Sequence, residues 1–188
     1  MKGIIASASA LVLVASVALA QSHHGAHHKA PAAQPYAGQH TRAVASLSDE
    51  DVSGFLDGRG MGLAKSAELN GHPGPMHVLE LAEQLKLTPE QRQLVEAAFA
   101  RMKAKAKALG DAYIAAEKAV DQAFKSGRAD AAEVAARVAE ANRLLGEVRL
   151  SHLLAHVEIT PALTPEQRAR YAELRGYAGG STHQHHKH

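Results

Sequence analysis

The chain contains no cysteine and no tryptophan, and aromatic residues make up only 4% of its 188 residues. Without cysteine it has no disulfide framework, no thiol nucleophile and no cysteine for lipid attachment. Lysine and arginine number 21 against 19 aspartate and glutamate residues, a near-neutral balance that gives no indication of nucleic-acid binding. Much of the 46% hydrophobic content is alanine. Such small side chains favour long, closely packed helices and make dimerisation a reasonable source of further core.

The first 20 residues have the features of an export signal. Lys2 precedes an apolar stretch from Ile4 to Val17 that is interrupted by serines, and Ala18-x-Ala20 supplies the small residues of a cleavage site. An uncleaved membrane anchor is the alternative, but the stretch is short for a spanning helix, which needs about 20 apolar residues. We therefore predict a signal peptide over residues 1–20, cleaved after Ala20.

The remainder divides into three parts by composition. Residues 21–46 are rich in histidine, alanine, glutamine, glycine and proline and lack apolar periodicity, which predicts a disordered leader. Residues 47–177 carry helical patterns throughout, and residues 178–188 return to the composition of the leader. We expect one all-α domain between two histidine-rich disordered tails.

Short helices are expected first in this domain. Ser48 and Asp51 have the spacing of a capping box at a helix start. A second short helix is expected within residues 61–71. A third begins after Pro75 and continues through Leu85 on its apolar periodicity.

The hexapeptide L-T-P-E-Q-R occurs twice, at residues 87–92 and 163–168. In the first copy Thr88 can cap a helix, Pro89 sits at the first helical position and Gln91 reaches back as the third residue. The segment between the copies shows no self-similarity, which argues against a tandem repeat. Each copy is therefore interpreted as a helix start, and the helix after the second copy ends before glycine 176.

Two apolar seams with alternating spacings of four and three lie between the copies. The first comprises Val95, Phe99, Met102, Ala106, Leu109, Tyr113, Ala116 and Val120, and the second comprises Val134, Val138, Ala141, Leu145, Val148, His152, Ala155 and Ile159. Ser126 and Gly127 end the first seam, and Asp130 with Glu133 caps the helix of the second. Two matched seams joined by a short turn predict a long antiparallel helical hairpin.

This combination resembles the periplasmic Spy/CpxP superfamily of LTxxQ-motif proteins, which includes heavy-metal sensors of the ZraP and CnrX types. The resemblance covers residues 75–177, and its motif residues are Leu87, Thr88, Gln91, Leu163, Thr164 and Gln167. It implies a periplasmic homodimer without enzymatic activity, in which the two boxes tie helix starts together. Members bind unfolded proteins without ATP, or sense envelope stress or heavy metals and restrain a membrane-bound signalling partner.

His152 and His156 are the strongest candidates for chemistry. Their spacing places both imidazoles on one helix face, with Cβ atoms about 5–6 Å apart, where they can chelate one metal ion. The spacing matches the H-E-x-x-H zinc hydrolases, but Leu153 replaces the glutamate that acts as general base, which argues against a metallopeptidase. The alternative is structural: His152 would be a hydrogen-bonded core residue and His156 a solvated one.

The resemblance to CnrX-type sensors implies a larger ligand set. His152 and His156 fall where those sensors carry a His-x3-Met pair, Met76 and His77 are candidates for the other half, and Glu96 could supply a carboxylate. The first-helix His-x3-His pair of those sensors is not reproduced here, which leaves the metal open among Zn, Cu(II), Ni and Co. The scattered Met61, Met76 and Met102 are interpreted as core filling rather than as a Cu(I) site.

Histidine pairs also recur in both tails. The tail candidates are His23, His24, His27, His28, His183, His185, His186 and His188. Neutral imidazoles in such clusters can capture Zn, Cu(II) or Ni with low affinity. The alternative is that these histidines only keep the tails soluble.

The sequence therefore predicts a periplasmic transition-metal-binding protein that acts in heavy-metal sensing or resistance, or in the envelope stress response. An ATP-independent periplasmic chaperone for unfolded proteins is the alternative. A metal buffer that works only through its histidine tails is a second alternative.

Overall fold

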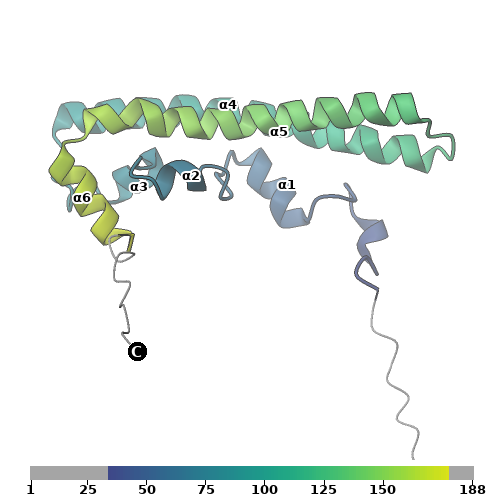
Figure 1. The fold of residues 1–188 in the computed structure, drawn as a ribbon, viewed down its shortest axis with the longest axis horizontal. Coiled ribbons are helices and arrows are strands. Elements are labelled where there is room, and N and C mark those ends of the chain that lie inside the picture. Colours follow the sequence, from purple (N-terminus) through teal and green to yellow (C-terminus); the bar gives the residue numbers. More distant parts are fainter. Residues whose placement is uncertain (1–33, 178–188) are drawn as a thin grey trace, which may run out of the picture. The chain divides into compact units, whose positions relative to one another are not determined.

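A computed structural model describes residues 34–177, and the fold presented here is that of residues 36–177 (Figure 1). Every regular element in this range is helical: α1 (Asp49–Leu56), α2 (Lys65–Glu68), α3 (Pro75–Glu80), α4 (Pro89–Lys125), α5 (Ala131–Ile159) and α6 (Pro165–Leu174), with short 3-10 turns at Gln39–Thr41 and Thr160–Ala162. The all-α prediction is confirmed. No helix in residues 34–177 is both long and apolar enough to cross a membrane. The predicted signal peptide and the eight tail histidines fall outside the described residues.

The predicted hairpin is formed by α4 and α5, which lie side by side and antiparallel (Figure 1). The Asp130 carboxylate begins α5 by accepting hydrogen bonds from the backbone N–H groups of Ala132 and Glu133, each at 2.9 Å. The buried faces differ from the predicted seams. Val138 of the second seam is 39% exposed, whereas Ala98 is buried beside the partly buried Phe99, and α5 buries adjacent residues such as Ser151 and His152. Both helices therefore bury a second face.

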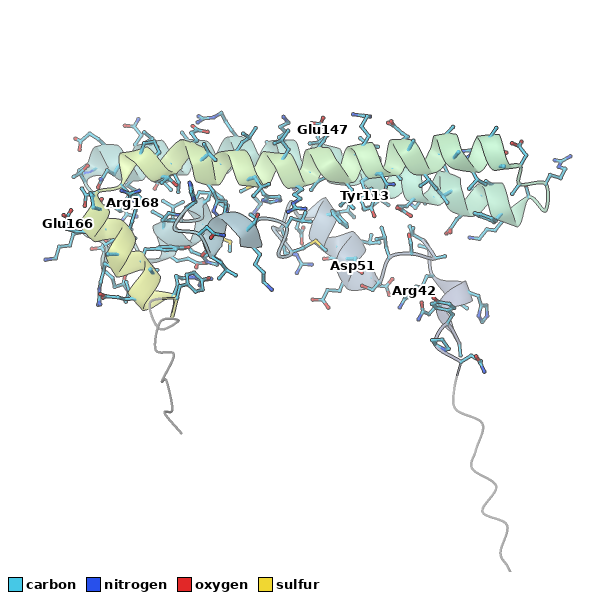
Figure 2. All side chains as sticks on the ribbon, in the orientation of Figure 1. Arg42, Asp51, Tyr113, Glu147, Glu166 and Arg168 are labelled. Atoms are coloured by element: carbon cyan, nitrogen blue, oxygen red, sulfur yellow. The ribbon has the colours of Figure 1, made fainter. Side chains whose placement is uncertain are left out.

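That second face is covered by the short helices, which lie along one side of the hairpin (Figure 1). The ring of Phe55 on α1 packs edge-on against Tyr113 on α4, with ring centroids 4.9 Å apart at 67°. Figure 2 shows Tyr113 on the side of α1 and Glu147 on the opposite side. Gly110 permits this approach, because a Cβ atom there would collide with the carbonyl oxygen of Phe55.

Two apolar clusters make up the core. The first contains Val44, Leu47, Phe55, Tyr113, Ile114, Ala141, Leu144 and Val148, and the second contains Val78, Leu85, Val95, Ala98, Ile159, Leu163 and Tyr171. Val44 lies within the range assigned to the leader, yet only 1% of its surface is exposed. Along α5 the clusters are separated by the stretch from Val148 to Ile159, which contains both candidate histidines.

The short helices are shorter than the sequence patterns predict. The helix expected within residues 61–71 is reduced to Lys65–Glu68, and the helix after Pro75 ends at Glu80 instead of continuing to Leu85. The chain turns after Glu80 and passes through Lys86 with a positive φ of 50°. This turn leaves Leu85 buried in the second cluster beside the start of α4, so tertiary packing overrides the local periodicity.

The two L-T-P-E-Q-R copies contact each other through their glutamines. The side-chain amides of Gln91 and Gln167 donate to each other in both directions, each at 2.9 Å. Each amide carbonyl also accepts from the backbone N–H of its own Thr88 or Thr164, completing a capping box. The second N–H groups donate to the backbone carbonyls of Ala162 and Leu85. Every hydrogen-bonding position of both amides is thereby used.

Replacing either glutamine by alanine should break the pair and leave the other amide unsatisfied. We expect Gln91→Ala and Gln167→Ala each to lower the free energy of unfolding by about 2–3 kcal/mol, because the orphaned partner bears a desolvation penalty. The double variant should lose about 1–2 kcal/mol less than the sum of the single losses. Urea unfolding of the four proteins measures this coupling. Gln93→Ala, an exposed residue of the same helix, is the control and should change stability by less than about 0.5 kcal/mol. Additive losses would contradict the pairing.

Candidate functional site

A cavity of about 530 Å³ opens between the two apolar clusters. Its hairpin wall is formed by Phe99 and Met102 of α4 and by His152 and His156 of α5. The other walls come from the segment of residues 57–77 and from residues near the end of α6. The segment that separates the two cores on α5 therefore lines an open space.

His152 is buried without a hydrogen-bond partner for one ring nitrogen. Only 5% of its surface is exposed, and its Nε2 atom is buried without a partner in the part of the chain that the structure describes. Burial lowers the pKa of His152 below its usual value near 6.5, and the neighbouring His156 lowers this pKa further. The imidazole is therefore neutral at pH 7 and keeps a lone pair for a ligand. The ring lies against the backbone of Gly60, where a Cβ would be 3.8 Å from Nδ1.

His156 is held in a defined orientation. Its Nδ1 atom lies 2.8 Å from the carbonyl oxygen of His72, and since a carbonyl only accepts, Nδ1 carries the proton. In the neutral ring, Nε2 is then the atom with the lone pair. A backbone carbonyl bound to one imidazole nitrogen is the arrangement that commonly orients metal-binding histidines. The backbone of Gly74 packs directly on this ring, because a Cβ there would be 2.9 Å from Cε1.

Glu68 anchors the segment that covers His156. Its carboxylate accepts hydrogen bonds from the hydroxyls of Tyr171 and Tyr177 and lies 3.5 Å from the guanidinium of Arg175. Burial and the contact with Glu68 raise the pKa of Tyr171 well above its usual value, which keeps this hydroxyl protonated as a donor. The same hydroxyl accepts from the backbone N–H of Gly74 at 3.3 Å. Tyr171 of α6 thus holds both Glu68 and Gly74, and Tyr177 adds a second bond to Glu68.

Of the other predicted ligands, some line the cavity and one does not. Met76 and His77 line the cavity with His152 and His156, but Nδ1 of His77 is bound to the carboxylate of Glu80 at 2.9 Å. Glu96 is exposed on α4 and does not line the cavity. Among residues 34–177, no three histidine, aspartate or glutamate side chains form a group that could hold a metal ion. The structure therefore brings the His152–His156 pair to the cavity but does not assemble the larger histidine and carboxylate set.

Sequence reasoning missed three residues of this cavity. No sequence pattern points to Glu68, and Met61 is 40% exposed rather than core filling, whereas Met102 is buried as predicted; all three line the cavity with the histidines. Met61 and Glu68 come from the segment of residues 57–77 and Met102 comes from α4, so no local spacing connects all three with the histidines of α5. His156 was also expected to be solvated in the structural alternative, whereas it is 7% exposed.

The fold and the cavity define a small helical protein with two capped helix starts bound to each other and a buried histidine pair beside them. The chain belongs to the LTXXQ motif family, whose sequence model matches residues 74–175, more than half of its length. This confirms the predicted Spy/CpxP-type superfamily and supports, at the level of the family, a periplasmic protein of the stress or metal-resistance type. No curated protein and no solved structure matches the chain.

Substitution of His152 by leucine separates a binding role from a structural one. In metal-free protein at pH 7 we expect His152→Leu to leave the free energy of unfolding unchanged or to raise it by up to about 1 kcal/mol, because a buried polar atom without a partner is removed. Chemical denaturation in the presence of a chelator measures this. A loss of several kcal/mol would show that His152 supports the fold.

The same variant should change the pH dependence of stability. The folded-state pKa of His152 is lowered, so its contribution is fully present above the unfolded pKa near 6.5 and is lost as the pH falls below that value. We expect the loss of stability between pH 7 and pH 5 to be smaller in His152→Leu than in the wild type. The exposed His40 is the control, and His40→Leu should leave the profile unchanged.

Proposed function

We propose that this protein binds a transition-metal ion in the cavity through His152 and His156 and serves heavy-metal sensing or resistance, or the envelope stress response. The observation that carries the proposal is the pair itself. Two buried imidazoles one helical turn apart line a cavity, and one of them keeps a buried nitrogen without a partner. Unpaired buried nitrogens cost about 1–3 kcal/mol, a cost that metal ligation would offset.

The residues present suit such an ion. Imidazole is a ligand for Zn, Cu, Ni and Co, and the bond from His156 to the carbonyl of His72 leaves its Nε2 available. A bound ion would supply a cross-link between side chains. His152 and His156 belong to α5, while the segment of residues 57–77 forms the facing wall. A bound ion would occupy space between α5 and this segment, and occupancy would in this way bias how the segment packs on the hairpin and what surface the protein offers.

In this proposal the protein acts by binding rather than by catalysis. It would work in the periplasm after removal of residues 1–20, as a homodimer, and its partner would be a membrane-bound sensor or signalling protein. The tail histidines would add weak metal capture at the surface.

Metal titration of full-length variants tests the proposal. We would replace the eight tail histidines by glutamine and compare this protein with the same protein carrying His152→Leu or His156→Leu, using Zn, Cu(II), Ni and Co. We expect one bound ion in the first protein and a loss of affinity of about tenfold or more in the other two, since each loses one of two imidazole ligands. His40→Ala is the control and should bind as before.

The variant with glutamine in the tails also distinguishes a metal site in the cavity from a metal buffer formed by the histidine tails. If glutamine in the tails removes all binding while His152→Leu changes nothing in the wild-type background, the protein is a buffer that uses its tails. That result would overturn the cavity as the metal site.

A chaperone role is the second candidate, and an exposed apolar surface on α5 favours it. Leu150, Leu154 and Val157 share one helix face and are 43%, 50% and 56% exposed. Such a stripe can hold an apolar segment of an unfolded client. Arg101 and Lys105 of α4 border it in a shallow groove next to Leu154.

Aggregation of a denatured client protein tests this second role. If the stripe binds clients, near-stoichiometric protein should suppress light scattering, and Leu154→Ser should reduce that suppression at least about threefold, because part of the apolar contact is lost. Arg149→Ser, an exposed polar position on the same helix, should not. Equal suppression of light scattering by both variants would exclude the stripe as the surface that binds clients.

A further inference from the structure

The cavity contains sulfur as well as nitrogen. The chain has four methionines, and Met61, Met76 and Met102 all line this one cavity. Met102 is buried, with 9% of its surface exposed, whereas Met61 and Met76 are 40% and 44% exposed. Core filling therefore does not account for Met61 and Met76, and Met102 is the one buried thioether among the three.

Met102 lies at the level of the two histidines along the hairpin. The ion pair between Arg101 and Glu158 shows that these neighbours of Met102 and His156 lie opposite each other on α4 and α5. On the outer side of the hairpin, Met102 lines a groove together with Ser151 and Ala155, the residues next to the histidines on α5. The thioether of Met102 is thus the non-histidine ligand atom that the hairpin itself brings to the level of the pair.

One carboxylate lies near the pair, on the protonated side of the His156 ring. Oε2 of Glu68 is 3.7 Å from Nδ1 of His156, the nitrogen that donates to the carbonyl of His72. Oε1 of Glu68 accepts from two tyrosine hydroxyls and faces the guanidinium of Arg175. The chain has no cysteine, and no three histidine, aspartate or glutamate side chains form a metal-binding group in residues 34–177. Zn takes about four ligands of these kinds, so the cavity is poorly furnished for it.

Cu(I) has different requirements. It accepts few ligands, and soft thioether sulfur together with imidazole nitrogen suits it. Two imidazoles and one buried thioether provide that combination. Ag(I) shares this preference and is stable in air, which makes it a convenient probe.

We propose that the cavity is a site for soft monovalent metal ions, Cu(I) and Ag(I), with His152, His156 and Met102 as ligands. This rests on the proposed function, since it uses the same histidine pair, and it adds the class of metal and a ligand that is absent from the histidine and carboxylate set. Met61 and Met76 also line the cavity, but they are largely exposed and are not assigned as ligands. The sulfur of Met61 packs instead against Gly54 of α1.

The experiment compares three identical substitutions in one cavity. In the full-length protein with glutamine at the eight tail positions, we would titrate Ag(I) by calorimetry and Cu(I) by competition with a chromophoric Cu(I) chelator under ascorbate. We expect one ion bound, and Met102→Leu should weaken the binding of both ions by about tenfold or more. Leucine conserves the volume, so the fold should be retained, which circular dichroism and thermal unfolding check.

Met61→Leu and Met76→Leu are the matched controls and should change the affinity for Ag(I) by less than about threefold. Met102→Leu should also leave the weaker binding of Zn and Ni within about twofold, because leucine removes only the soft ligand. Equal losses in all three leucine variants, or tighter binding of Zn or Ni than of Ag(I), would overturn the soft-metal assignment. In either case, weaker metal binding by His152→Leu would still support a metal site at the histidine pair. If His152→Leu binds every ion as tightly as the parent protein does, both the metal site and its assignment to soft metals are wrong.

Discussion

The paired amides of Gln91 and Gln167 are the interaction on which the arrangement of the site depends. They join the start of α4 to the start of α6, and through the carbonyls of Leu85 and Ala162 they also hold the segments that enter both helices. Because α6 is fixed in this way, Tyr171 reaches Glu68 and Gly74, which cover His156. The duplicated hexapeptide contributes no ligand, yet it positions the wall of the cavity.

The hairpin is built from two apolar cores with a polar interval between them. Apolar residues at positions 152 and 156 would join the clusters into one continuous core, and such burial is the main favourable contribution to folding. Two histidines occupy these positions instead, one of them with a buried nitrogen that lacks a partner. No hydrogen bond among the described residues compensates for burying this nitrogen. We therefore assign the histidines to ligand binding.

Features set by local chemistry could be predicted from the sequence. The capping residues Ser48, Thr88, Asp130 and Thr164 were identified from spacings of three residues, and the hairpin from its two seams. Features set by distant contacts could not. The early end of α3, the burial of His156 and the meeting of Met61, Met76 and Met102 depend on how the short helices cover the hairpin, and no periodicity encodes that. The histidine pair was predictable because its two residues share one helix.

The central claim is that the imidazoles of His152 and His156 bind one metal ion. Long-range proton–nitrogen correlation NMR of the nitrogen-15-labelled full-length protein observes each imidazole directly. Before metal is added, the account predicts a His156 ring protonated at Nδ1. One equivalent of Ag(I) should then shift the unprotonated nitrogen of His156 and one nitrogen of His152 together. Unchanged signals from both rings, with shifts confined to the tail histidines, would contradict the account.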